Sequence, residues 1–77
     1  MNLIQVRYFA GIRERLGRDQ ELVDAEGIRC ASDVWSRVSG ALGPVRVLVA
    51  INQEYAAMDH PVGPGDEIAF FPPVTGG

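Results

Sequence analysis

The residues with the clearest chemical potential stand at the end of the sequence, in the segment FFPPVTGG, residues 70–77. Pro72 and Pro73 have no backbone N–H to give to a sheet, so we expect strand pairing to stop there and the chain to leave as extended, polyproline-like backbone. Gly76 and Gly77 carry no side chains, so the tip of this tail fits a slot too narrow for any other residue. From Pro72 onward the tail reaches at most about 20 Å.

The α-carboxylate of Gly77 is the reactive group that such a tail would present. A carboxylate is a poor electrophile until ATP converts it into an acyl-adenylate. Once activated, it accepts sulfur as a thiocarboxylate or is joined to an amine. We therefore predict that Gly77 is the reacting residue, and that Val74 and Thr75 complete a thin arm that delivers it into a partner enzyme.

The other reactive residue types are sparse. The sequence has one cysteine, Cys30, and one histidine, His60. A single cysteine excludes an intrachain disulfide and a cysteine-based metal cluster. Although a thiol near a helix start can be activated, Cys30 has no histidine close in sequence and is interpreted as structural; His60 is interpreted as a solvated turn residue. We expect this chain to bind no metal and no cofactor.

Composition limits the class of protein. With 77 residues, 47% hydrophobic and 22% charged, the chain predicts one globular domain, residues 1–71, followed by the tail, residues 72–77. Its net charge is −3, with seven arginines and no lysine, which argues against a nucleic-acid partner. The longest apolar run, VRVLVAI, is too short to span a membrane, and no signal-peptide pattern opens the sequence. We expect a cytoplasmic protein without a membrane partner.

Hydrophobic periodicity predicts the elements that carry the tail. One convincing helix is expected over residues 30–43, with Ser32 as N-cap and Gly43 and Pro44 ending it; its apolar stripe is Val34, Trp35, Val38 and Leu42. Strands are expected over residues 2–9, 20–27, 45–52, 53–58 and 67–71, and a short helical or turn segment over residues 10–17. This order predicts an α+β fold: a mixed sheet of about five strands, with its first and last strands central and one main helix packed on one face.

A single helix leaves the second face of the sheet uncovered. If alternation directs Ile4, Val6 and Tyr8 toward the helix, the outward residues near the tail are apolar: Phe9, Leu48, Ala50 and Phe71. Exposed apolar patches mark partner surfaces. A register shift of one residue would reverse these assignments, so the alternative that they face the core stays open.

Three stretches resemble one family: GDEIAFFPPVTGG (residues 65–77), VRYFAGIRERLG (residues 6–17) and VLVAINQEYAAMDHPVGPGDE (residues 47–67). They are similar to the small subunits of molybdopterin synthase, which are β-grasp, ubiquitin-like sulfur carriers. The family's ending of two prolines, valine, a small residue and two glycines is present throughout, with Thr75 in the small position.

The resemblance implies a carrier without catalytic groups of its own. An adenylating, E1-like enzyme would use Mg-ATP to activate Gly77, a sulfur donor protein would convert it to a thiocarboxylate, and the large synthase subunit would supply the catalytic groups that pass the sulfur to a pyranopterin precursor during molybdenum cofactor biosynthesis. The family assembles as a heterotetramer. Phe9 and Phe71 would lie at the contact with the large subunit, and we expect Leu48 to lie with them.

Three other functions remain open on the sequence. A sulfur carrier of another pathway, such as thiamine thiazole synthesis, would share the fold and the terminal glycines but normally lacks the double proline. A ubiquitin-like modifier would join Gly77 to protein amines. A plain interaction module would not need the glycines. An iron–sulfur ferredoxin is excluded, because one cysteine cannot hold a cluster.

Overall fold

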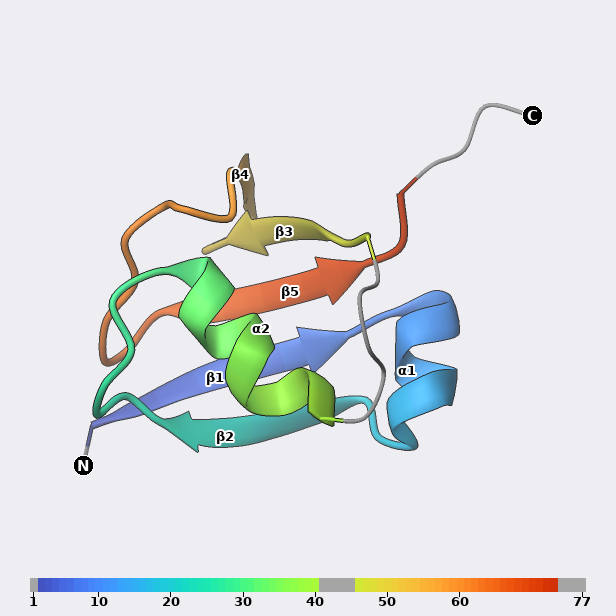
Figure 1. Ribbon diagram of the computed structural model, residues 1–77, viewed down its shortest axis with the longest axis horizontal. Coiled ribbons are helices and arrows are strands. Elements are labelled where there is room, and N and C mark those ends of the chain that lie inside the picture. Colours follow the sequence, from blue (N-terminus) through green and yellow to red (C-terminus); the bar gives the residue numbers. More distant parts are fainter. Residues whose placement is uncertain (1, 41–45, 74–77) are drawn as a thin grey trace.

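The computed structural model describes residues 2–40 and 46–73 (Figure 1). The predicted α+β, β-grasp fold is confirmed: in the described residues, five strands form one mixed sheet and two α-helices accompany it. In chain order the elements are β1 (Leu3–Tyr8), α1 (Ala10–Leu16), β2 (Gln20–Asp24), α2 (Ala31–Ser39), β3 (Leu48–Ile51), β4 (Glu54–Ala56) and β5 (Glu67–Phe71).

The sheet has the strand order β2-β1-β5-β3-β4, so the first and last strands are neighbours at its centre, as predicted. β1 and β5 run parallel, with Val6 opposite Ile68 and Tyr8 opposite Phe70. All other pairs are antiparallel. Both central strands therefore finish at one end of the sheet, where α1 lies (Figure 1); we call this the tail end.

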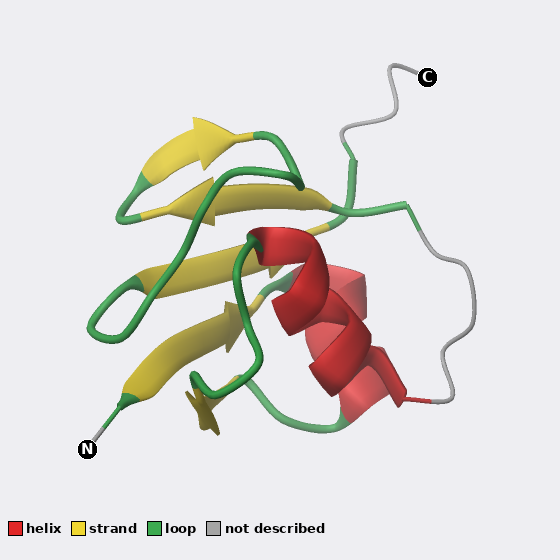
Figure 2. Ribbon diagram, turned by 60° about the vertical axis from the view of Figure 1, so that its left-hand side comes forward, coloured by secondary structure: helices red, strands yellow, loops and turns green. Residues whose placement is uncertain are grey.

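The core lies between the sheet and α2, which crosses one face of the sheet (Figure 2). Alternate residues of β1 and β5 point into it and are buried: Ile4, Val6, Tyr8, Ile68 and Phe70. From α2, Val34 and Val38 are buried. Trp35 is half-buried, and the centroid of its ring lies 4.9 Å from that of the Phe70 ring. The predicted helix stripe is confirmed for these three residues, and Leu42 lies outside the described residues.

The start of α2 differs from the prediction. Ser32 is not the N-cap: Cys30 holds that position, without a side-chain cap hydrogen bond, and the helix begins at Ala31. The carboxylate of Asp33, in the first turn, accepts a hydrogen bond of 2.9 Å from the backbone N–H of Arg29. This bond, which favours the charged form, holds the pKa of Asp33 below its usual value. The side chain of Asp33 thus bonds to the backbone of Arg29, one residue before the N-cap Cys30, and stabilises the chain where it enters the helix.

Several predicted elements are shorter in the structure. α2 ends at Ser39, with Gly40 as its C-cap at a φ of 53°, ahead of the predicted end at Gly43 and Pro44. β2 ends at Asp24, because the carboxylate of that residue accepts a bond of 2.9 Å from the N–H of Glu26 and starts a turn. The strand predicted from residue 45 begins at Leu48 as β3, and the returning strand, β4, has three residues.

A two-residue turn joins β3 to β4. Asn52 and Gln53 both have positive φ, 51° and 70°, as in the type I′ turns that match the twist of a hairpin. The side chain of Asn52 accepts a bond of 3.0 Å from the N–H of Glu67 and donates one of 3.1 Å to Asp66. The turn is therefore tied to the start of β5.

Candidate functional site

The tail leaves directly from a central strand. β5 ends at Phe71, as predicted, and Pro72 and Pro73 follow outside the sheet, half-buried. The last backbone bond beyond the paired residues of β1 and β5 runs from the N–H of Phe9 to the carbonyl of Phe70, at 3.1 Å. The predicted tail residues Val74, Thr75, Gly76 and Gly77 lie outside the described residues. The site that can be described is therefore the surface around the root of the tail.

The sheet register places four apolar side chains on the face away from α2, at or near the tail end. Leu48 of β3 pairs with Phe71 of β5, and Ala50 pairs with Tyr55 of β4. Phe9 has extended backbone that continues the alternation of β1, so its side chain falls on the face opposite that of Tyr8. We call Phe9, Leu48, Tyr55 and Phe71 the aromatic patch.

The aromatic patch is accessible. Phe9, Leu48 and Tyr55 are exposed, with 44%, 38% and 78% of their surfaces accessible, and Phe71 is half-buried. The rings of Tyr55 and Phe71 meet edge to face with their centroids 5.5 Å apart. Because Phe70 is fully buried, the register is the one that the alternation predicted, and Phe71 faces outward.

Tyr55 is the member of the patch that the sequence did not single out. Its position depends on where the hairpin turns: with Asn52 and Gln53 forming the turn, Tyr55 comes opposite Ala50 and beside Phe71. The strand predicted over residues 53–58 includes Gln53, which lies in the turn, and therefore does not specify that Tyr55 pairs with Ala50. The asparagine, which tolerates positive φ, was the available signal for the turn.

Leu22 of β2 is a further exposed apolar residue, 63% accessible. It pairs with Gln5 and so lies on the same face as the patch. Gln5 and Arg7 of β1 lie between Leu22 and the patch residues of β5, β3 and β4. Leu22 is therefore not part of the aromatic patch.

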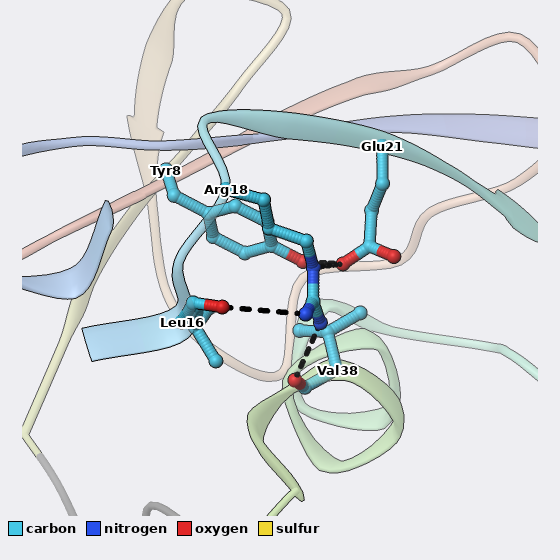
Figure 3. Close-up of polar contacts among 5 residues, drawn as sticks. All are labelled: Tyr8, Leu16, Arg18, Glu21 and Val38. Atoms are coloured by element: carbon cyan, nitrogen blue, oxygen red, sulfur yellow. Dashed lines mark hydrogen bonds and ion pairs between the residues drawn. The ribbon is translucent and has the colours of Figure 1, made fainter. Parts of the chain in front are cut away.

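The tail end is held together by a cluster under the sheet (Figure 3). The hydroxyl of the buried Tyr8 donates to the carboxylate of Glu21, and the guanidinium of Arg18 donates to the same oxygen at 2.7 Å. Arg18 also reaches the carbonyls of Leu16, at 3.5 Å, and Val38, at 3.4 Å. One arginine thus links α1, β2 and α2, which fixes the end of the sheet from which the tail leaves.

The electrostatics of this cluster favour a neutral tyrosine. Burial raises the pKa of Tyr8 well above its usual value, and the bond to Glu21 and the charge of that carboxylate raise it further; the nearby Arg18 opposes them. The hydrogen bond to Glu21 raises the pKa of Arg18. Tyr8 is therefore a structural hydrogen-bond donor here and not an acid near neutral pH.

Cys30 and His60 do not form a reactive site with each other. Cys30 is half-buried and pairs through its backbone with Pro61, and the ring Nδ1 of the exposed His60 lies 2.9 Å from the carbonyl of Pro61. Across residues 2–40 and 46–73, no three acidic, histidine or cysteine side chains are grouped as a metal would require.

Neither described helix has the length and apolar character needed to cross a membrane.

Comparison with known proteins places this geometry in a family. Residues 6–77 match the ThiS family. The molybdopterin synthase sulfur carrier subunit of Escherichia coli (strain K12) is 43% identical, over 97% of this chain and 100% of that protein. The solved structure of the small archaeal modifier protein 1 of H. volcanii is 30% identical, with a TM-score of 0.73, over 94% of this chain and 98% of that chain.

A more distant structure shares the fold. It is a chain in the protein–protein complex of subunits 1 and 2 of the molybdopterin-converting factor from Helicobacter pylori 26695. That chain is 20% identical, with a TM-score of 0.63, over 97% of this chain and 99% of that chain. This structure shows the fold alone; the family resemblance seen in the sequence is confirmed by the match over residues 6–77 and by the E. coli relative.

Proposed function

The chain belongs to the ThiS family, and from that premise we propose that it is the sulfur carrier subunit of a molybdopterin synthase. The observation that carries the proposal is the end of β5, where a central strand of the sheet leads directly into two prolines, with Gly76 and Gly77 following three residues later in the sequence. The name of the E. coli relative supports the same function.

The proposed cycle has two steps at Gly77. In the first, an E1-like enzyme binds the carrier with Mg-ATP; a carboxylate oxygen of Gly77 attacks the α-phosphorus, and pyrophosphate leaves. In the second, the terminal sulfur of a persulfide on a donor protein attacks the acyl carbon and displaces AMP, which leaves an acyl disulfide. A thiol then attacks the donor's own sulfur and breaks the S–S bond; it forms a disulfide with the donor and releases Gly77 as a thiocarboxylate. These reactants place the proposed activity in the cytoplasm, where ATP and its magnesium ion are abundant.

Sulfur transfer follows in the large subunit. The aromatic patch would dock on that subunit, and the tail, stiffened by Pro72 and Pro73, would thread Gly76 and Gly77 into its active site. Aromatic side chains at a desolvated contact are the residues that usually dominate binding energy. The large subunit supplies the catalytic groups, and two carriers provide the two sulfurs of the dithiolene.

A ubiquitin-like modifier is the second candidate. It is favoured by the similarity to the small archaeal modifier protein 1 of H. volcanii. Both functions begin with adenylation of Gly77, so activation alone does not separate them. They differ in the acceptor, which is sulfur for the carrier and a protein amine for the modifier.

The test is the intact mass of the carrier after incubation with an adenylating enzyme, ATP and a sulfur donor. Replacing one oxygen by sulfur adds about 16 Da, and we expect this gain on the C-terminal peptide. A chain lacking Gly77 is the control and should gain nothing. Conjugates of the chain with other proteins, without the 16 Da gain, would favour the modifier; neither product with any activating enzyme would contradict both.

A further inference from the structure

Charge is unevenly distributed along the sheet. Arg7 and Glu67 contact each other across neighbouring strands, so their charges cancel. Among the other charged residues, the tail end carries four arginines and three acids, a net charge of +1, although the whole chain has −3. The opposite end carries two arginines and six acids, a net charge of −4. The tail-end groups are Arg13, Arg15, Arg18, Arg46, Glu14, Asp19 and Glu21; the others are Arg29, Arg37, Asp24, Glu26, Asp33, Glu54, Asp59 and Asp66.

Two arginines near the tail end have acidic partners. Arg7 pairs with Glu67 at 3.0 Å and Arg18 pairs with Glu21 at 2.7 Å. Within the described residues, 2–40 and 46–73, these two contacts are the ion pairs, and neither includes Arg13 or Arg46. Both of these side chains are exposed, so their charges are available to a partner.

Arg13 and Arg46 each lie close to a different member of the aromatic patch. Arg46 comes two residues before Leu48, the first residue of β3, which pairs with Phe71. Arg13, from α1, lines a hollow of about 170 Å³ together with Phe9 of the patch. The other residues that line it are Arg7, Tyr8, Asp19 and Gln20, so one carboxylate lies near the two arginines.

We propose that Arg13 and Arg46 form a basic rim that docks on an acidic protein surface around the tail-accepting channel of the large subunit. An apolar aromatic centre with arginine at its border is the composition of a protein interface. A nucleic acid is disfavoured by the acidic far end of the same small domain. The inference rests on the proposed function and adds the charge of the partner's docking surface.

A rim of this kind acts mainly on the rate of encounter, because complementary charges steer diffusion over about a Debye length. The oriented charge also turns the tail end, and not the acidic end, toward an acidic partner. The association rate should therefore fall as salt rises from about 20 to 300 mM, over which screening becomes short-ranged.

The experiment measures association of the full chain with the large subunit by stopped-flow fluorescence at several salt concentrations. Arg13→Glu and Arg46→Glu are each expected to slow association at least five-fold at low salt and to flatten its salt dependence. Arg29→Glu is the matched control, since it changes the net charge equally at an exposed residue of the opposite end. It should change the rate less than two-fold. Circular dichroism checks that each variant is folded.

The outcomes separate the rim from the function. If the wild-type chain binds but Arg13→Glu and Arg46→Glu behave like Arg29→Glu, the rim is contradicted and the carrier function stands. If the two reversals accelerate association, the docking surface is basic, and the inference is again wrong. If the wild-type chain does not bind the large subunit at any salt concentration, the proposed function and the rim both fall.

Discussion

At the scale of single residues, one carboxylate oxygen serves two donors below the tail end of the sheet. Glu21 accepts from the hydroxyl of Tyr8 and from the guanidinium of Arg18. Tyr8 is 1% accessible, so water does not replace its bond when the partner is lost. An unpaired buried polar group costs more than an exposed one.

Tyr8→Phe should lower the free energy of unfolding by about 2 kcal/mol, because a buried hydrogen bond to a charged acceptor is lost. The measurement is urea unfolding followed by circular dichroism. Tyr55→Phe removes a hydroxyl from a side chain that is 78% accessible, and should change stability by less than about 0.5 kcal/mol. Equal losses in the two variants would show that the Glu21 bond contributes nothing.

The raised pKa of Tyr8 predicts alkaline destabilisation. The folded chain holds this proton more tightly than the unfolded chain, so the stabilisation is fully present below the unfolded pKa of about 10 and is lost as the pH rises above it. In a Tyr55→Phe background, tyrosinate absorbance should appear only together with loss of the far-UV circular dichroism signal. Ionisation of Tyr8 in a chain that stays folded would contradict this.

At the scale of elements, the β3–β4 turn contains a residue ill-suited to its backbone. Gln53 has a φ of 70°, in the left-handed region where a side chain is strained. Asn52, at 51°, tolerates that conformation and also bonds to Glu67 and Asp66. The two positions should therefore respond in opposite ways to glycine.

Gln53→Gly should raise the free energy of unfolding by about 0.5 to 1 kcal/mol, since relief of strain exceeds the added entropy of the unfolded glycine. Asn52→Gly should lower it by about 1 kcal/mol, because the two side-chain bonds are lost. Thermal unfolding of both variants makes the comparison. Destabilisation by Gln53→Gly would mean that the turn is not held in the left-handed region.

The sequence predicted the long, regular elements well and their ends poorly. Alternation along β1 and β5 identifies the core side, because each of these strands buries one face only. The N-cap of α2 was misplaced at Ser32, since a cap depends on which backbone groups turn toward it, and here Asp33 bonds to the chain before the cap instead. Tyr55 was missed because its neighbour across the sheet depends on a turn register.

At the scale of the whole molecule, the uncovered face provides a direct test of docking. Phe71→Ala should weaken binding to the large subunit about 30-fold, the effect of losing a central aromatic anchor worth about 2 kcal/mol. Leu22→Ala is the matched control: it is an exposed apolar residue of the same face, outside the patch. Calorimetric titration should find its affinity within two-fold of the wild type.

An equal loss in both variants would mean that the large subunit contacts the face as a whole and that the patch has no special part in binding. No loss in either would place the docking surface elsewhere on the chain. Circular dichroism on Phe71→Ala is needed, because its ring also contacts Tyr55 within the domain.

The charge polarity of the molecule could not be predicted from the sequence. Arg13 and Arg46 lie 33 residues apart, and only the sheet order brings the end of β1 and the start of β3 to one edge of the surface. In sequence, Arg13, Arg15 and Arg18 are interleaved with Glu14 and Asp19, so no run of like charge marks this surface. In the fold, Arg18 pairs with Glu21, whereas Arg13 is exposed and has no ion pair among the described residues.

The parallel pairing of β1 and β5 has a mechanical consequence. The start of β1 and the end of β5 lie at opposite ends of two adjacent strands. A force that pulls the tail away from the start of β1 would therefore act along both strands in shear, and their hydrogen bonds would have to break together instead of one by one. Resistance to such a load is governed by the unfolding rate. A tail gripped in one protein could thus be withdrawn without unravelling the body that carries it.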